Sequence, residues 1–139
     1  MKKIINLFSF LLMLLGSYPA ISWATPYNIA PQARVSASSS IDAGHDAAKV
    51  TDGLIRVPGK GEWVSKSTET FWGQIDYPWI QLDWERPVNI NKIILYDRPA
   101  MEAHVAGGVL HFSDGSTINV WGMANDGTPK EIEFESRKV

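Results

Sequence analysis

Short stretches of alternating apolar and polar residues, separated by turn signals, run through most of this chain and leave little room for long helices. Residues 79–84 alternate so that Ile80, Leu82 and Trp84 share one face, as along a β-strand. Residues 88–96 are apolar on both faces at their centre, which is typical of a strand inside a sandwich. The Asp114-Gly115 pair lies between two further apolar stretches and predicts a hairpin.

The remaining strand candidates are shorter, and they recur at steady intervals between glycine-containing turns. One short helix is expected, over residues 45–50. This pattern predicts an all-β domain folded as a β-sandwich or barrel. The shorter candidates cover residues 35–39, 62–65, 109–112, 117–121 and 131–135.

The first 24 residues have the three parts of a secretory signal peptide. Lys2 and Lys3 precede an apolar run over residues 4–15, and Ser22-Trp23-Ala24 supplies small residues at the positions a signal peptidase reads. The run is shorter than the about 20 residues that span a bilayer, which favours cleavage over a retained anchor. We expect a periplasmic or secreted protein with one domain over residues 25–139 and no membrane span after cleavage.

The composition of the expected mature chain excludes several classes of function. Loss of Lys2 and Lys3 leaves 11 basic and 15 acidic residues, a net charge of −4, which argues against nucleic acid or an anionic membrane as partner. The chain has no cysteine, so disulfides, lipid anchoring through cysteine, thiol catalysis and zinc-thiolate sites are excluded. Its length suffices for a packed core without such cross-links.

Several segments, taken in order, resemble the discoidin or coagulation-factor type C superfamily, which includes the family 32 carbohydrate-binding modules. The resemblance covers residues 28–139 and implies a galactose-binding-like, antiparallel jelly-roll β-sandwich with ligand loops at one end. In that family a further strand normally follows residues 131–134, so we expect the sandwich to lack its last strand or to leave an edge open. The segments are Asn28-Ile29-Ala30, Val35-Ser36-Ala37-Ser38-Ser39, Ala48-Lys49-Val50-Thr51-Asp52-Gly53, Glu62-Trp63, Trp79-Ile80-Gln81-Leu82-Asp83-Trp84, Pro87-Val88-Asn89-Ile90, Ile94-Leu95-Tyr96-Asp97-Arg98-Pro99 and Phe112-Ser113-Asp114-Gly115-Ser116.

Arg98 is the first candidate ligand-binding residue. It follows the strongest predicted strand, and the resemblance implies an arginine near this rim that donates to sugar hydroxyls. The planar fork of a guanidinium suits paired sugar oxygens. The alternative is a structural pair with Asp97, and we favour the structural role for Asp97 and the ligand role for Arg98.

Tryptophan could supply a stacking surface for the apolar face of a sugar ring. Trp72 lies in a segment with turn character, and stacking and core packing stay open for it. Trp121 is a second option, for which core packing is favoured. We assign Trp63, Trp79 and Trp84 to the core because they fall within predicted strands.

Two further residues complete the predicted ligand site. His104 lies in the loop that follows Arg98, where it could touch a ligand. Asn125 lies in an Asn-Asp-Gly sequence and could donate or accept hydrogen bonds at a loop tip, although ordinary turn chemistry is the favoured interpretation. The histidines show no metal-ligand spacing.

The resemblance also implies a structural calcium ion at the Asp52-Gly53 turn. Calcium takes six to eight oxygen ligands, and residues 49–62 could supply carbonyls beside the Asp52 carboxylate. A plain Asp-Gly turn is the alternative, and both stay open.

These residues predict a secreted, non-catalytic module that binds carbohydrate through loops at one end of the sandwich, and no catalytic motif is present. Such a module could act beside a separate sugar-processing enzyme. The first alternative is a protein-interaction or cell-envelope structural module that uses an open edge near residues 131–134. The second is a small glycoside-active hydrolase that uses Glu62 and Asp97 as its acid pair.

Overall fold

A computed structural model describes residues 27–55, 57, 61–66, 77–99 and 105–139 of the chain. Within them all the strands pair antiparallel and the helices are short 3-10 turns, so the all-β prediction is confirmed. In this part of the chain no helix is long and apolar enough to cross a bilayer. The elements are η1 (Ala30–Gln32), β1 (Arg34–Ala37), η2 (Ala43–His45), η3 (Ala47–Thr51), β2 (Ile80–Asp83), β3 (Asn89–Leu95), β4 (Gly107–His111), β5 (Thr117–Trp121) and β6 (Lys130–Lys138).

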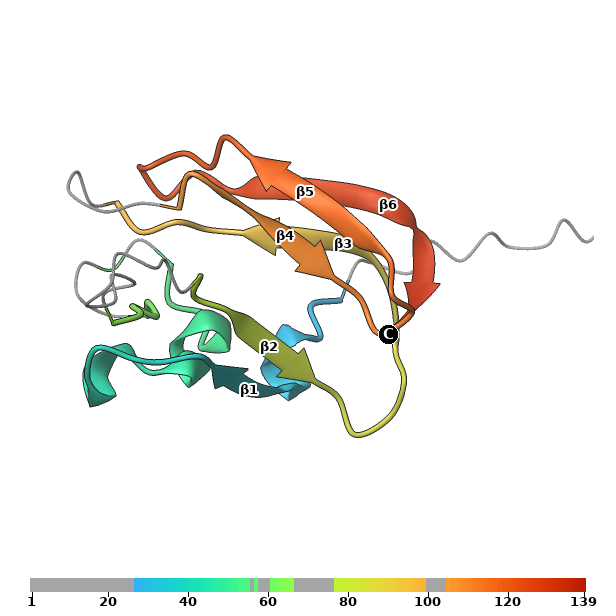
Figure 1. Cartoon of the computed structure of the whole chain (residues 1–139), viewed down its shortest axis with the longest axis horizontal. Coiled ribbons are helices and arrows are strands. Elements are labelled where there is room, and N and C mark those ends of the chain that lie inside the picture. Colours follow the sequence, from blue (N-terminus) through green and yellow to red (C-terminus); the bar gives the residue numbers. More distant parts are fainter. Residues whose placement is uncertain (1–26, 56, 58–60, 67–76, 100–104) are drawn as a thin grey trace, which may run out of the picture.

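The described strands pair two by two. β1 pairs with β2, β3 with β6, and β4 with β5. Figure 1 shows the β3–β6 and β4–β5 pairs together in one half of the molecule, with β1–β2 in the other half. The predicted signal peptide lies outside the described residues.

The β4–β5 hairpin closes as its sequence predicts. Asp114 Oδ1 accepts hydrogen bonds from the backbone N–H (2.8 Å) and the hydroxyl of Ser116, and these bonds hold the pKa of Asp114 below its usual value. Gly115 has a φ of +83°, a conformation that residues with a Cβ rarely adopt. The backbone conformation therefore favours glycine at position 115, and Asp114 stabilises the turn through its hydrogen bonds.

The β3–β6 and β4–β5 pairs pack against each other through the aromatic rings of Phe112 and Phe134. We call the sides that face each other the inner sides. Phe112 and Val120 are buried, and Phe112 meets Phe134 of β6 edge to face with ring centroids 5.4 Å apart. The guanidinium carbon of Arg137 lies 4.2 Å from the Phe112 centroid and 4.8 Å from that of Phe134. Apolar burial and cation–π attraction thus hold β6 against the β4–β5 hairpin.

The structure corrects several local predictions. Residues 62–65 form no strand, because single backbone hydrogen bonds to the segment before η3 replace a ladder. The predicted helix over residues 45–50 is present as the 3-10 turns η2 and η3. Trp79 is 51% exposed rather than part of the core. Trp63 and Trp84, which the sequence assigned to the core, are only partly buried and lie outside the strands, and their indole N–H groups donate to backbone carbonyls.

Candidate ligand-binding site

The ends of several strands meet at one end of the molecule, which we call the loop end. β3 and β5 finish there, and β2, β4 and β6 begin there, next to η2 and η3 (Figure 1). The predicted ligand residue Arg98 follows β3 at this end, and Asn125 lies in the turn between β5 and β6. Because β3 and β5 finish at the same end, they bring together two predicted ligand-binding residues that are far apart in the sequence.

One side of the loop end is built by two segments that run side by side. The Trp63 indole N–H donates to the carbonyl of Ser39 at 2.8 Å, and Ile41 N donates to the carbonyl of Val64 at 2.8 Å. Val64 N in turn donates to the carbonyl of His45 at 3.3 Å. These bonds fix Glu62, the residue before Trp63, close to the His45 ring.

The η2 turn orients that ring. Asp42 caps the turn by accepting from the backbone N–H groups of Gly44 and His45, and its Oδ1 also lies 2.8 Å from His45 Nδ1. The bond to the His45 ring is the main reason that the pKa of the Asp42 carboxyl lies below its usual value. With Nδ1 held by Asp42, Nε2 of His45 faces Glu62.

Asp97 holds the other side of the loop end in place. It is 8% exposed, and its two oxygens accept from Arg98 N at 2.9 Å and Val105 N at 2.8 Å. The carboxylate therefore ties the two ends of the loop between β3 and β4, the structural role that the sequence favoured for it. Arg98 is left with its side chain directed to Glu62.

The result is a half-buried polar cluster of His45, Glu62 and Arg98. Glu62 Oε1 lies 3.6 Å from His45 Nε2 and 3.7 Å from Arg98 Nη1, and the three side chains are 26%, 17% and 29% exposed. Both distances exceed those of hydrogen bonds, so the groups are close without saturating one another. Such a cluster offers a fork of N–H donors beside a carboxylate acceptor, which suits a ligand with several hydroxyls.

Sequence reasoning missed His45 and Glu62 as partners of Arg98. His45 was considered only as a metal ligand, and Glu62 only as part of an acid pair with Asp97. The contact depends on how two loops pack, and no spacing along the chain signals it. The Asp42 cap three residues before His45 is the one local sign that this histidine is held in place.

Of the other predicted ligand-binding residues, the structure describes Asn125 but not Trp72 or His104. Trp72 and His104 lie outside the described residues. Asn125 is partly exposed at the loop end, in a turn where Asp126 Oδ1 accepts from Thr128 N at 2.8 Å. Asn125 and Arg98 thus share one end of the molecule.

Asp52 occupies the turn that the sequence predicts. Its Oδ1 accepts from Leu54 N at 2.9 Å, and Gly53 has a φ of +78°. Within the described residues, no group of three or more histidine, aspartate or glutamate side chains gathers around a metal position. A calcium ion here would need most of its oxygens from backbone carbonyls, and calcium accepts such ligands. Calcium binding stays a prediction.

Trp121 is a correction. The sequence favoured core packing, but the residue is 68% exposed at the end of β5. Its ring lies across Gly107, the residue directly opposite on β4, where an added Cβ would come within 2.4 Å of Cε3. The Gly107-Gly108 pair was the available sequence signal, because glycine in a strand often marks a close approach.

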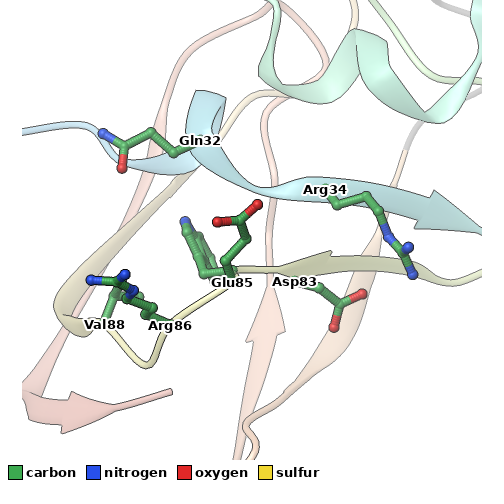
Figure 2. Close-up of a pocket in the computed structure, with 7 residues that line it drawn as sticks. Gln32, Arg34, Asp83, Glu85, Arg86 and Val88 are labelled. Atoms are coloured by element: carbon green, nitrogen blue, oxygen red, sulfur yellow. The ribbon is translucent and has the colours of Figure 1, made fainter.

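A depression with a volume of about 490 Å³ lies at the opposite end of the molecule from the loop end. Figure 2 shows its polar side chains pointing in different directions, with Arg34 directed away from Glu85 and Gln32. Because these groups do not converge, the depression is a weaker candidate than the loop end. Its lining residues are Gln32, Arg34, Asp83, Trp84, Glu85, Arg86 and Val88.

Comparison with known proteins gives one family. The model of a domain of unknown function (DUF7402) matches residues 28–139. No curated protein and no solved structure matches the chain.

Proposed function

The chain belongs to the DUF7402 family, and from the geometry of its loop end we propose that it is an exported, non-catalytic carbohydrate-binding module with a discoidin-like jelly-roll fold. The observation that carries the proposal is the half-buried cluster of His45, Glu62 and Arg98. Hydrogen bonds to the backbone hold the segments that carry these groups, and the distances among the three side chains exceed those of hydrogen bonds. A sugar presents hydroxyls that donate and accept at the spacing of such groups.

The proposed site is shallow and binds weakly. Hydrogen bonds at a partly exposed rim replace bonds to water, so the net gain of each is about 1 kcal/mol. Stacking on an aromatic ring, the role proposed for Trp72, would add to this. Asn125, at the loop end, is proposed to contribute a further hydrogen bond, and the contribution of His104 stays the expectation drawn from its place in the sequence after Arg98.

Calorimetric titration with galactose and N-acetylglucosamine tests the site. We expect Arg98→Ala to lower the association constant for the bound sugar at least tenfold, and Glu62→Gln to lower it several-fold. Arg86→Ala, at the opposite end of the molecule, is the matched control and should leave binding unchanged. Unchanged affinity in Trp72→Ala/Arg98→Ala would refute the site.

A non-catalytic role agrees with the contacts of the carboxylates. Both oxygens of Asp97 accept backbone N–H groups, so this residue is engaged in holding its loop. Asp97 is therefore occupied by the backbone of its own loop, which argues against its acting with Glu62 as an acid pair for glycoside hydrolysis. Turnover of chromogenic glycosides by the purified protein would overturn this part of the proposal.

We also propose a structural calcium ion at the Asp52 turn, whose stabilising effect is measured by melting. Calcium at 100 times its dissociation constant would stabilise the fold by about 2.7 kcal/mol. The melting temperature should rise with calcium, fall again with a chelator, and lose this response in Asp52→Asn. A melting temperature that ignores calcium would remove the ion from the proposal.

The second candidate function is protein interaction through a sheet edge. β6 is nine residues long and, among the described strands, pairs with β3 along one edge. An unpaired strand edge can take up a further strand from a partner. Light scattering distinguishes the two functions, since a monomer at all concentrations argues against self-pairing through this edge.

A further inference from the structure

The outer side of the β4–β5 hairpin forms an uncharged strip. In an antiparallel pair, directly opposite residues share a face, and three such pairs fall on this side. None of their side chains is lysine, arginine, aspartate or glutamate, and all but the first glycine are exposed. The pairs are Gly107 with Trp121, Val109 with Asn119, and His111 with Thr117.

Trp121 makes one end of this strip an aromatic platform. An added Cβ on Gly107 would lie 2.4 Å from Cε3 and 2.9 Å from Cζ3 of the indole, so the ring rests directly on the glycine backbone. The residue is nevertheless 68% exposed. A tryptophan that is supported from below and open above presents a flat apolar surface with a hydrogen-bonding N–H.

The chemistry next to the platform suits a neutral, hydroxyl-bearing ligand. Val109, 49% exposed, adds apolar surface, while Asn119 and Thr117 add an amide and a hydroxyl that donate and accept. The strip has no lysine, arginine, aspartate or glutamate, and histidine counts as neutral at pH 7, so an ionic ligand would gain no permanent ion pair there. Charge therefore favours a neutral glycan over an acidic or basic polymer.

The size of the strip argues against a protein partner. Four residue steps of about 3.3 Å give it a length of about 13 Å, and its two strands lie about 4.8 Å apart. A fully exposed aromatic side chain presents on the order of 150–250 Å², so the strip exposes roughly a few hundred Å², below the roughly 800 Å² that each partner buries in a stable protein interface. A narrow chain laid along the hairpin fits this surface.

We propose that the uncharged strip binds a neutral polysaccharide chain, with one sugar ring stacked on Trp121 and neighbouring hydroxyls bonded to Asn119 and Thr117. This surface is separate from the Arg98 cluster and goes beyond the proposed function. It ends beside the loop end, because Gly122 N donates to the carbonyl of Ala106 at 3.2 Å and Val105 N donates to Asp97. An extended ligand can therefore run from the strip toward Arg98.

The test is calorimetry of the purified protein with neutral hexasaccharides of glucose, xylose and mannose, and with a galacturonic acid hexasaccharide as the charged comparison. We expect Trp121→Ala to lower the association constant for the bound neutral hexasaccharide about tenfold. This factor corresponds to about 1.4 kcal/mol, the order expected for uncovering one indole face. The charged hexasaccharide should bind more weakly than the neutral one.

Two glycine variants isolate the geometry of the platform. Gly107→Ala places its Cβ against the indole and should lower neutral hexasaccharide binding several-fold, with the tryptophan still present. Gly108→Ala is the matched control, since an added Cβ there meets nothing within 4 Å. Melting curves of all three variants check that the hairpin remains folded.

The outcomes separate this proposal from the loop-end site. Trp121→Ala should leave monosaccharide binding unchanged. Arg98→Ala should lower the association constant for the monosaccharide at least tenfold and retain the dependence of hexasaccharide binding on Trp121. The proposal is overturned if no neutral hexasaccharide binds, or if Trp121→Ala binds it as well as the wild type does. A wild-type dimer that Trp121→Ala dissociates would also overturn it, because the strip would then be a protein interface.

Discussion

The β3–β6 and β4–β5 strand pairs share an inner surface at Phe112 and Phe134, but their outer sides differ in chemistry. On β3–β6, Lys92 Nζ lies 2.8 Å from Glu131 Oε2 and 2.6 Å from Glu133 Oε1. These contacts raise the pKa of Lys92 and lower that of Glu133. On β4–β5 the outer side is the uncharged strip.

This difference in chemistry suits the two outer sides to different tasks. Charged pairs on a sheet surface stay solvated and discourage edge-to-edge association. An exposed tryptophan with no charge beside it is a surface that water covers poorly, and such surfaces in soluble proteins are commonly binding sites. We infer that one strand pair maintains solubility while the other presents a ligand surface.

The largest expected effect concerns the shared inner surface. Phe112→Ala should lower the free energy of unfolding by about 3–5 kcal/mol, because it removes a buried ring that contacts Phe134 and Arg137. Trp121→Ala, on the outer side, should change it by less than about 0.5 kcal/mol. Urea denaturation measures both. Equal losses would contradict the distinction between a stabilising inner side and a binding outer side.

The next largest effect concerns the Asp114-Gly115 turn that connects the two strands of the uncharged strip. Gly115→Ala should cost about 1 kcal/mol, because the φ of +83° disfavours any residue with a Cβ. Gly108→Ala is the control, because an added Cβ meets no atom within 4 Å at either position. Chemical denaturation of the two variants thus isolates the backbone conformation. A loss in Gly108→Ala as large as that in Gly115→Ala would refute the explanation.

A smaller effect concerns the charged outer side. Salt screens exposed ion pairs, so the urea midpoint of the wild type should fall slightly between low salt and 1 M NaCl. Lys92→Met should lose most of this response, whereas Asn119→Ala on the uncharged strip should keep it. A salt response that is the same in all three proteins would show that the Lys92 contacts contribute nothing measurable.

The smallest expected effect is a difference in how salt changes the lowered pKa values of the Asp114 and Glu133 carboxyls. Asp114 is held by hydrogen bonds from the neutral Ser116, whereas Glu133 is held mainly by Lys92. Carboxyl NMR titrations should therefore show that 1 M NaCl raises the pKa of Glu133 and leaves that of Asp114 nearly unchanged. A larger shift at Asp114 than at Glu133 would reverse the assigned causes.

The same pKa directions fix the sign of the pH dependence. Each of the two carboxyls has a lower pKa in the folded chain than in the unfolded chain, so the unfolded state binds more protons. Their stabilising contribution is present above the usual carboxyl range and is lost as the pH falls through the lowered folded values. Urea midpoints below pH 4 should decline less steeply in Glu133→Gln than in the wild type.

Local sequence patterns predicted most of the described strands. Residues 117–121 and 88–96 were identified because a strand with one or two buried faces leaves a periodic apolar signal. Residues 62–65 were misassigned for the same reason, since a short apolar stretch packed in a loop shows the same pattern. The Asp114-Gly115 turn was predictable because its hydrogen bonds are made within four residues.

The sequence by itself therefore determined the all-β class and the β4–β5 hairpin, both of which depend on interactions between near neighbours or on periodicity. The tertiary structure decided that His45 and Glu62 join Arg98, and that Trp121 faces outward over Gly107. These contacts arise where loops and strands distant in the sequence come together. Tertiary packing determines these contacts, and no local pattern in the sequence predicts them.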